Sequence, residues 1–290
     1  DGIDVTGVSL NTIVGGSGSQ TAAALMDLER IEVVKGPQTV YFGRSAFAGA
    51  IQFISKRPEF TTGGSVSGAI GDYGRRELTG HITGPIIADK VAAKLSATYR
   101  KHGGFYSNPG NGMGLGASET YGIGGSVLVE GGPFEARVSL NYLNEHSTPG
   151  AAFLIERPDV TEFGVNRIDE STYQENKGLI GISSHMDYLG NKSETWRGTA
   201  NMKYDLGGGF ELASTTGVNK VQGTIQFDFD TKMQNTPDWS IDNNCLKAVC
   251  VGIAEFDSNL QQISQELRLT YDSDNLRLLA GGYFFDENYE

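Results

Sequence analysis

The chain has 290 residues and a formal net charge of −12, from 23 Lys and Arg against 35 Asp and Glu. This acidic balance argues against a nucleic-acid-binding protein, because phosphate backbones attract cations. Glycine is abundant, with 40 residues, and proline is scarce, with 8, which excludes collagen-like and proline-rich disordered chains. The longest apolar run, 278–285, is too short for a transmembrane helix, but membrane β-strands hide their hydrophobicity by alternation and escape this test.

The first 60 residues carry mixed signals. Short β-branched runs predict strands over 31–34 and 50–54, each followed by a turn. The segment 21–28 is long enough for two helical turns. We therefore predict a small α/β unit over residues 1–60.

After residue 60 the hydrophobic period becomes 2. In the segment 90–101, Val91, Leu95 and Tyr99 alternate with Lys94 and Thr98, so one face is apolar and the other polar. The same alternation predicts nine strands, over residues 63–71, 76–84, 90–101, 119–130, 134–145, 194–205, 210–223, 260–272 and 276–288.

Two architectures produce this alternation. In a soluble sandwich the apolar face is the core, whereas in an outer-membrane barrel it meets lipid. The segments favour the barrel, because they have the length of tilted membrane strands, about 9–11 residues or more. Aromatic residues also lie at the predicted strand ends, as in the interfacial girdles of barrels: Tyr99, Tyr121, Phe134, Tyr142, Tyr204, Phe210 and Tyr271.

The connections alternate in length. Those over 84–89, 131–133, 206–209 and 273–275 are short, while 103–118, 146–193 and 224–259 are long and only 71–75 is short on their side. Short turns at one rim and long loops at the other are typical of bacterial outer-membrane barrels. Nine strands are an odd number, and open edges in lipid leave backbone groups unpaired. We therefore expect an incomplete, all-β transmembrane barrel from a longer mature protein.

The segment 27–37, DLERIEVVKGP, and the segment 43–51, GRSAFAGAI, together resemble the end of the plug domain in the TonB-dependent outer-membrane receptor family. The opening Asp1-Gly2-Ile3 is similar to the segment that precedes this motif. Two positions depart from the family pattern, where Ala48 replaces a glycine and Gln52 replaces an asparagine.

The resemblance implies a 22-stranded barrel in the bacterial outer membrane, closed by a plug. Residues 1–60 would be the C-terminal part of the plug, and residues 61–290 the first part of the barrel. The family imports scarce ligands, most often ferric siderophores, with energy from the TonB–ExbB–ExbD complex, which binds a TonB box expected upstream of this chain. Haem, cobalamin or an oligosaccharide are alternative ligands, and a passive channel or adhesin is the alternative of another class.

The resemblance also assigns roles to single residues. Arg30 and Glu32 would join ionic contacts that seat the plug against the barrel, unless they are solvated strand charges. Tyr41, Phe42 and Arg44 would contact the ligand; otherwise the two aromatic residues belong to the plug core and Arg44 is another ion partner of the barrel.

The remaining chemistry is sparse. Cys245 and Cys250 are the two cysteines, and we expect a local disulfide between them in an oxidising compartment. No metal site or cofactor is expected; Ca²⁺ bound by Asp228 and Asp230 is an alternative to solvated loop charge. The four histidines lie far apart and no catalytic motif is present, so we do not expect an enzyme.

Overall fold

The computed structural model describes residues 27–37, 49–107, 112–148, 190–228 and 253–290 of the chain. Every regular element within these ranges is a β-strand. No helix in the described residues has the length and apolar character needed to cross a membrane.

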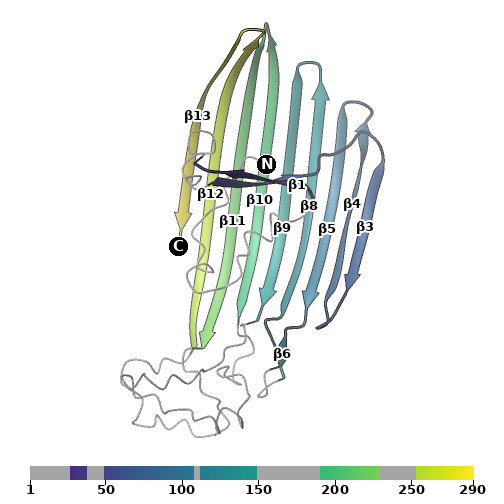
Figure 1. Ribbon diagram of the computed structural model, residues 1–290, viewed down its shortest axis with the longest axis vertical. Helices are drawn as coiled ribbons and strands as arrows, with labels where there is room; N and C mark the ends of the chain where they lie inside the picture. The colour runs from purple at the N-terminus through teal and green to yellow at the C-terminus, as the bar shows by residue number, and fades with distance from the viewer. Residues whose placement is uncertain (1–26, 38–48, 108–111, 149–189, 229–252) are drawn as a thin grey trace.

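Most of the described residues form one antiparallel sheet of nine strands, which lie side by side in Figure 1. The strands follow one another across the sheet in chain order, and β3 and β13 form its two edges. Their bounds are β3 Gly63–Ile70, β4 Arg76–Ile87, β5 Val91–His102, β8 Ser118–Gly131, β9 Phe134–Ser147, β10 Asn191–Gly207, β11 Phe210–Asp228, β12 Ile253–Ser273 and β13 Leu276–Tyr289. All nine strands predicted from the alternation are confirmed.

Two smaller strand pairs accompany the sheet. β1 (Leu28–Lys35) and β2 (Gly49–Ser55) pair with each other and confirm the predicted strands of the first 60 residues. The predicted helix over 21–28 is wrong at Leu28, because Asp27, with a φ of 47°, turns the chain directly into β1; residues 21–26 lie outside the described part. β6 (Tyr106–Ser107) and β7 (Gly114–Leu115) form a hairpin that was not predicted.

The sheet is apolar on its exposed face and polar on its covered face. On β5, Leu95 is 60% exposed while its neighbour Lys94 is 5% exposed. The same inversion recurs along the sheet: Leu140 and Met202 are exposed, whereas Ser139, Thr199 and Asn219 are buried. A soluble sandwich would bury the apolar face instead. The structure therefore has the face distribution of a membrane barrel wall, with the apolar side outward.

Two groups of aromatic side chains bound the outward apolar band. Near the short turns, Phe134 lies opposite Tyr204, and the rings of Phe210 and Tyr271 are 4.6 Å apart. At the other end, the rings of Tyr142 and Trp196 are 4.6 Å apart, and Tyr121 lies 6.5 Å from Tyr142. Tyr142 follows Phe134 by eight residues, or about 26 Å along a strand. With a tilt of about 40°, this gives a depth of about 20 Å, close to the apolar band of an outer-membrane barrel.

Short and long connections lie at opposite rims, as predicted. The connections 88–90, 132–133, 208–209 and 274–275 join strands at the upper rim of Figure 1, here called the short-turn rim. The connections 71–75, 103–117, 148–190 and 229–252 belong to the opposite, long-loop rim. The strands at this rim extend further than predicted, since β12 begins at Ile253 rather than at residue 260.

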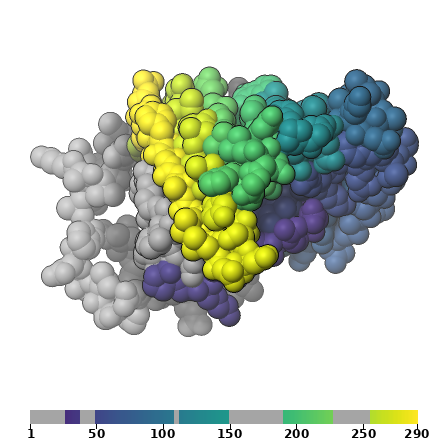
Figure 2. Space-filling model, turned by 90° about the horizontal axis from the view of Figure 1, so that it is seen from above, coloured from purple at the N-terminus to yellow at the C-terminus, as the bar shows by residue number. Residues whose placement is uncertain are grey.

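Viewed from above the short-turn rim, the sheet is a curved wall (Figure 2). In Figure 1 the β1–β2 pair crosses in front of the sheet, and in Figure 2 its purple atoms lie beside one face of the wall. The contacts described next identify this face as the polar one.

Candidate functional site

The candidate site is the junction where the β1–β2 pair joins the polar face of the sheet. The two ends of the pair meet there, because the Lys56 backbone N–H donates to the Asp27 carbonyl oxygen at 3.1 Å. The chain then runs across the wall, and the Glu59 N–H donates to the Thr83 hydroxyl of β4 at 2.8 Å.

The Asp27 carboxylate is the centre of the junction. Its side chain is 6% exposed and contacts Lys94 Nζ of β5 at 2.5 Å. His81 Nδ1 of β4 lies 3.3 Å from the other carboxylate oxygen, and Lys56 Nζ lies 4.0 Å from it. The Lys94 contact is an ion pair rather than an aligned hydrogen bond. A buried charge is costly unless it is paired, so Asp27 and Lys94 each stabilise the other inside the wall.

Cations of the wall also bind the main chain of the crossing segment. Lys94 Nζ donates to the Lys56 carbonyl oxygen at 2.6 Å. Arg137 of β9 donates through Nη2 to the same oxygen at 3.2 Å and through Nη1 to the Ser55 carbonyl oxygen at 3.4 Å. These bonds fix the end of β2 whatever side chains it carries, so the junction is held by backbone as well as by charge.

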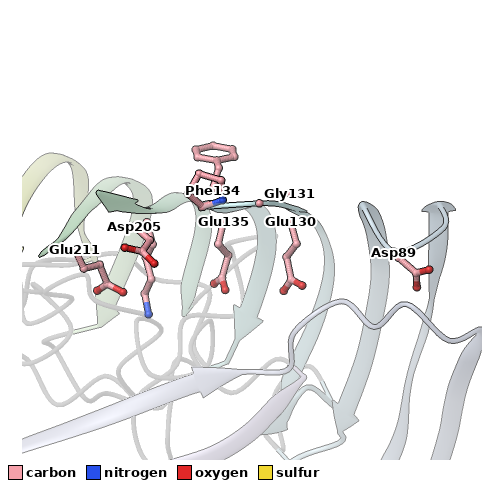
Figure 3. Close-up of a pocket in the computed structure, with 10 residues that line it drawn as sticks. Asp89, Glu130, Gly131, Phe134, Glu135, Asp205 and Glu211 are labelled. Carbon is pink, nitrogen blue, oxygen red and sulfur yellow. The ribbon is translucent and has the colours of Figure 1, made fainter. Parts of the chain in front are cut away.

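A second ionic contact lies closer to the short-turn rim. Arg57 Nη2 lies 2.7 Å from a Glu135 carboxylate oxygen and 3.6 Å from one of Glu130. Both acids line a shallow hollow with Asp89, Asp205 and Glu211 (Figure 3). Figure 3 shows the Phe134 ring on the opposite side of the sheet from the carboxylates of Glu130 and Glu135. The acids of this rim thus lie on the polar face, which carries the β1–β2 pair, and the aromatic residue lies on the outward apolar face.

The polar face continues as hydrogen-bonded side chains across β10 to β13. Arg197 Nε donates to Asn219 Oδ1 at 3.4 Å, and Asn219 Nδ2 donates to Gln262 Oε1 at 2.8 Å. Gln262 Nε2 in turn donates to Glu287 Oε2 at 2.5 Å. Such a polar inner wall is suited to contact with a plug or with water rather than with lipid.

Sequence reasoning missed the residues of the junction. Asp27, Lys94 and Arg137 were not singled out, although a signal was present for two of them. Lys94 and Arg137 stand at polar-face positions of predicted strands, and a cation there needs a partner inside the barrel. The acid that supplies the partner for Lys94 cannot be located without the fold, because it comes from the other unit.

The predicted site residues fall into two groups. Arg30 and Glu32 are described and pair with each other, since Arg30 Nε donates to Glu32 Oε1 at 2.7 Å. Arg30 Nη1 also donates to Glu29 Oε1 at 2.6 Å, and the hydrogen bond with Glu32 raises the pKa of Arg30. Their contact with the barrel stays a prediction. The other group lies outside the described residues: Tyr41, Phe42, Arg44, Asp230, Cys245 and Cys250, together with the side chain of Asp228.

Within the described ranges, no group of three or more His, Cys, Asp or Glu side chains has the arrangement of a metal site. No protein-family profile matches the chain.

Relatives are found by sequence. The chain is 29% identical over 199 residues to the catecholate siderophore receptor Fiu of Escherichia coli, a match that covers 67% of the chain and 25% of the relative. It is 40% identical over 74 residues to the ferrioxamine B receptor of Salmonella typhimurium, which covers 25% of the chain and 10% of that receptor. The chain thus spans about a quarter or less of the length of these curated relatives.

Solved structures agree on the fold. The ferric yersiniabactin uptake receptor FyuA of Yersinia pestis matches with a TM-score of 0.70 at 18% identity, over 91% of this chain and 37% of that one. The ferric-catecholate import receptor Fiu of E. coli matches with a TM-score of 0.62 at 22% identity, over 91% of this chain and 40% of that one. In its sequence relatives and in its inside-out sheet, the chain is similar to part of the TonB-dependent outer-membrane siderophore receptors.

Proposed function

We propose that the receptor of which this chain is part takes up a ferric siderophore across the outer membrane, with energy from the TonB–ExbB–ExbD complex. The observation that carries the proposal is the junction, where a buried ion pair and wall cations hold the β1–β2 pair against the polar face of an inside-out sheet. A passive channel does not need a unit bound inside its wall to close the pore, whereas an energised receptor does. Relatives named as receptors for catecholate siderophores and for ferrioxamine B support the ligand class.

The proposal divides the chain in two. Residues 1–60 form the C-terminal part of the plug, and residues 61–290 form the first part of the barrel. The crossing segment 55–59 supports this boundary, because it leaves β2, contains no further strand and bonds to Thr83 of β4 just before β3 begins. The remaining strands of a 22-stranded barrel belong to the rest of the receptor.

Within the plug, we assign ligand contact to Tyr41, Phe42 and Arg44, and contact with the barrel to Arg30 and Glu32. We also assign a local disulfide to Cys245 and Cys250. The resemblance of the segment 27–51 to the plug motif supports the plug assignments.

Uptake by cells provides the test. A strain that depends on the full-length receptor is given radioactive iron as a ferric catecholate or as ferrioxamine, with and without a protonophore. We expect the protonophore to abolish uptake of the transported complex. We also expect Arg44→Ala to weaken binding of that complex by about tenfold, as loss of a charged hydrogen bond does.

Arg75→Ala is the matched control, because Arg75 is a cation of the connection 71–75, outside residues 1–60, and pairs with Glu77 at 2.9 Å. It should leave binding unchanged. Uptake that continues in the presence of the protonophore would contradict energised transport and favour the passive channel. Unchanged affinity in Arg44→Ala would contradict only the assignment of the ligand contact.

A further inference from the structure

A row of charged residues crosses five strands at the long-loop rim. Direct cross-strand pairing joins each to the next, from β4 through β5, β8 and β9 to β10. We call it the cationic row, and its members are Arg76, Lys101, Glu119, His146 and Lys192.

The cationic row lies on the outward face of the sheet. Lys101 follows the exposed Leu95 and Tyr99 at even spacing, and Lys192 precedes Trp196 by four residues, so each shares the face of its aromatic neighbour. Two residue pairs closer to the apolar band, and on the same face, Tyr99 lies opposite Tyr121. The row therefore begins where the aromatic girdle ends, at the depth of lipid headgroups.

Its charge is opposite to that of the chain. Three cations stand against one carboxylate, in a chain whose formal net charge is −12. Glu119 contacts Lys101 Nζ at 3.1 Å and accepts a hydrogen bond from the Tyr99 hydroxyl at 2.7 Å. His146 lies within electrostatic range of Lys101, Lys192 and Glu119. Beyond Lys192 the row turns neutral and then acidic, since Thr224 and Asp257 follow and hydrogen-bond to each other.

The opposite rim lacks this arrangement among the described residues. There the outward positions carry Phe134, Tyr204 and Phe210, while Glu130 and Glu135 face the plug side. In the part of the chain that the structure describes, cations at headgroup depth thus gather outward at the long-loop rim only. Adjacent strands are about 4.8 Å apart, so the row is about 19 Å wide, enough to contact more than one phosphate.

We propose that the cationic row binds the phosphate groups of anionic lipid headgroups in the leaflet at the long-loop rim. Lysine and arginine bind phosphate through charge-assisted hydrogen bonds, and a basic cluster at the membrane surface concentrates anionic lipid. The occupant is a membrane lipid rather than a soluble anion, because the row adjoins the girdle and faces away from the plug side. This inference does not depend on which ligand the receptor transports.

Lipid quenching of Trp196 provides the test. The full-length receptor is reconstituted in phosphatidylcholine bilayers that contain brominated phosphatidic acid or, in parallel, brominated phosphatidylcholine. Bromine quenches tryptophan on contact, and subtraction of the signal of Trp196→Phe isolates Trp196, which lies on the same face as Lys192, four residues along β10, and whose ring contacts Tyr142. We expect phosphatidic acid to occupy the site about tenfold more readily than phosphatidylcholine.

Matched triple variants separate charge from structure. Arg76→Gln with Lys101→Gln and Lys192→Gln should abolish the preference for phosphatidic acid, whereas the charge-preserving Arg76→Lys, Lys101→Arg and Lys192→Arg should keep it. Removal of three cations at the short-turn rim is the control with equal net charge, and it should also keep the preference: Lys90→Gln, Lys203→Gln and Arg277→Gln.

The lipid assignment is overturned if the row variant retains the preference, or if the short-turn control loses it equally. Inorganic phosphate separates the two possible sources of the anion. It should reduce quenching no more than sodium chloride of equal ionic strength; a larger reduction would assign the row to a soluble anion instead.

Discussion

At the scale of single residues, the Asp27–Lys94 pair joins the β1–β2 unit to the wall of the sheet. Both side chains are almost fully buried, at 6% and 5% exposure. Their environment differs from that of Lys101 and Glu119, which form an ion pair at 3.1 Å with more than 40% of each side chain exposed. Solvent screens the exposed pair, while the buried pair has only its neighbours to offset lost hydration.

We therefore predict that Lys94→Met in the full-length receptor destabilises the attachment of β1–β2 by about 3–5 kcal/mol, because it leaves the Asp27 carboxylate buried without its nearest cation. Hydrogen exchange of the amides of residues 28–35 measures this loss. The exposed counterpart Lys101→Met should cost about 1 kcal/mol or less. Adding Asp27→Asn to Lys94→Met should restore part of the protection, and a purely additive double variant would contradict a direct coupling.

At the scale of strands, the alternation of apolar and polar residues was the main basis for predicting the sheet and its two faces. Leu95 beside Lys94 and Leu140 beside Ser139 already separate two faces in the sequence, and the structure exposes the apolar member of each pair. A period of 2 fixes which residues share a face, and length and loop order then indicate that the apolar face meets lipid.

The limits of the strand prediction have physical causes as well. β11 and β12 continue to Asp228 and from Ile253, beyond the apolar band, where side-chain hydrogen bonds between Thr224 and Asp257 and between Gln226 and Glu255 join the hairpin in addition to backbone pairing. These cross-strand contacts are not visible in the sequence. The β6–β7 hairpin has two residues per strand, too few to show any period. The junction was missed because its contacts join residues distant in the chain.

The outward face can be tested on β9. Leu140 is 54% exposed between the two aromatic groups, and its neighbour Asn141 faces the polar side. We predict that Leu140→Arg reduces the free energy of folding into bilayers by about 2–4 kcal/mol, because it places a charge in hydrocarbon. Asn141→Arg is the matched control and should cost less, since its side chain enters a polar wall. Equal costs would contradict the assignment of the two faces.

At the scale of the whole molecule, the differences between the two rims indicate how the barrel is oriented in the membrane. The short-turn rim carries inward acids and outward aromatic residues, whereas the long-loop rim carries the cationic row and the long connections. Bacterial barrels place short turns in the periplasm and long loops outside the cell. The same orientation puts the cationic row in the outer leaflet, so the direction of the barrel and the lipid assignment are linked.

Cysteine labelling of intact cells tests this direction. In a full-length receptor with Cys245→Ser and Cys250→Ser, we predict that Asp72→Cys, in the connection at the long-loop rim, reacts with a membrane-impermeant maleimide. Asp274→Cys, in the β12–β13 turn at the opposite rim, should react only after the outer membrane is permeabilised. Both sites are turn residues outside the strands, so a difference in labelling reports the side of the membrane rather than burial. If Asp274→Cys alone is labelled in intact cells, the barrel has the opposite orientation in the membrane. The cationic row would then lie in the periplasmic leaflet.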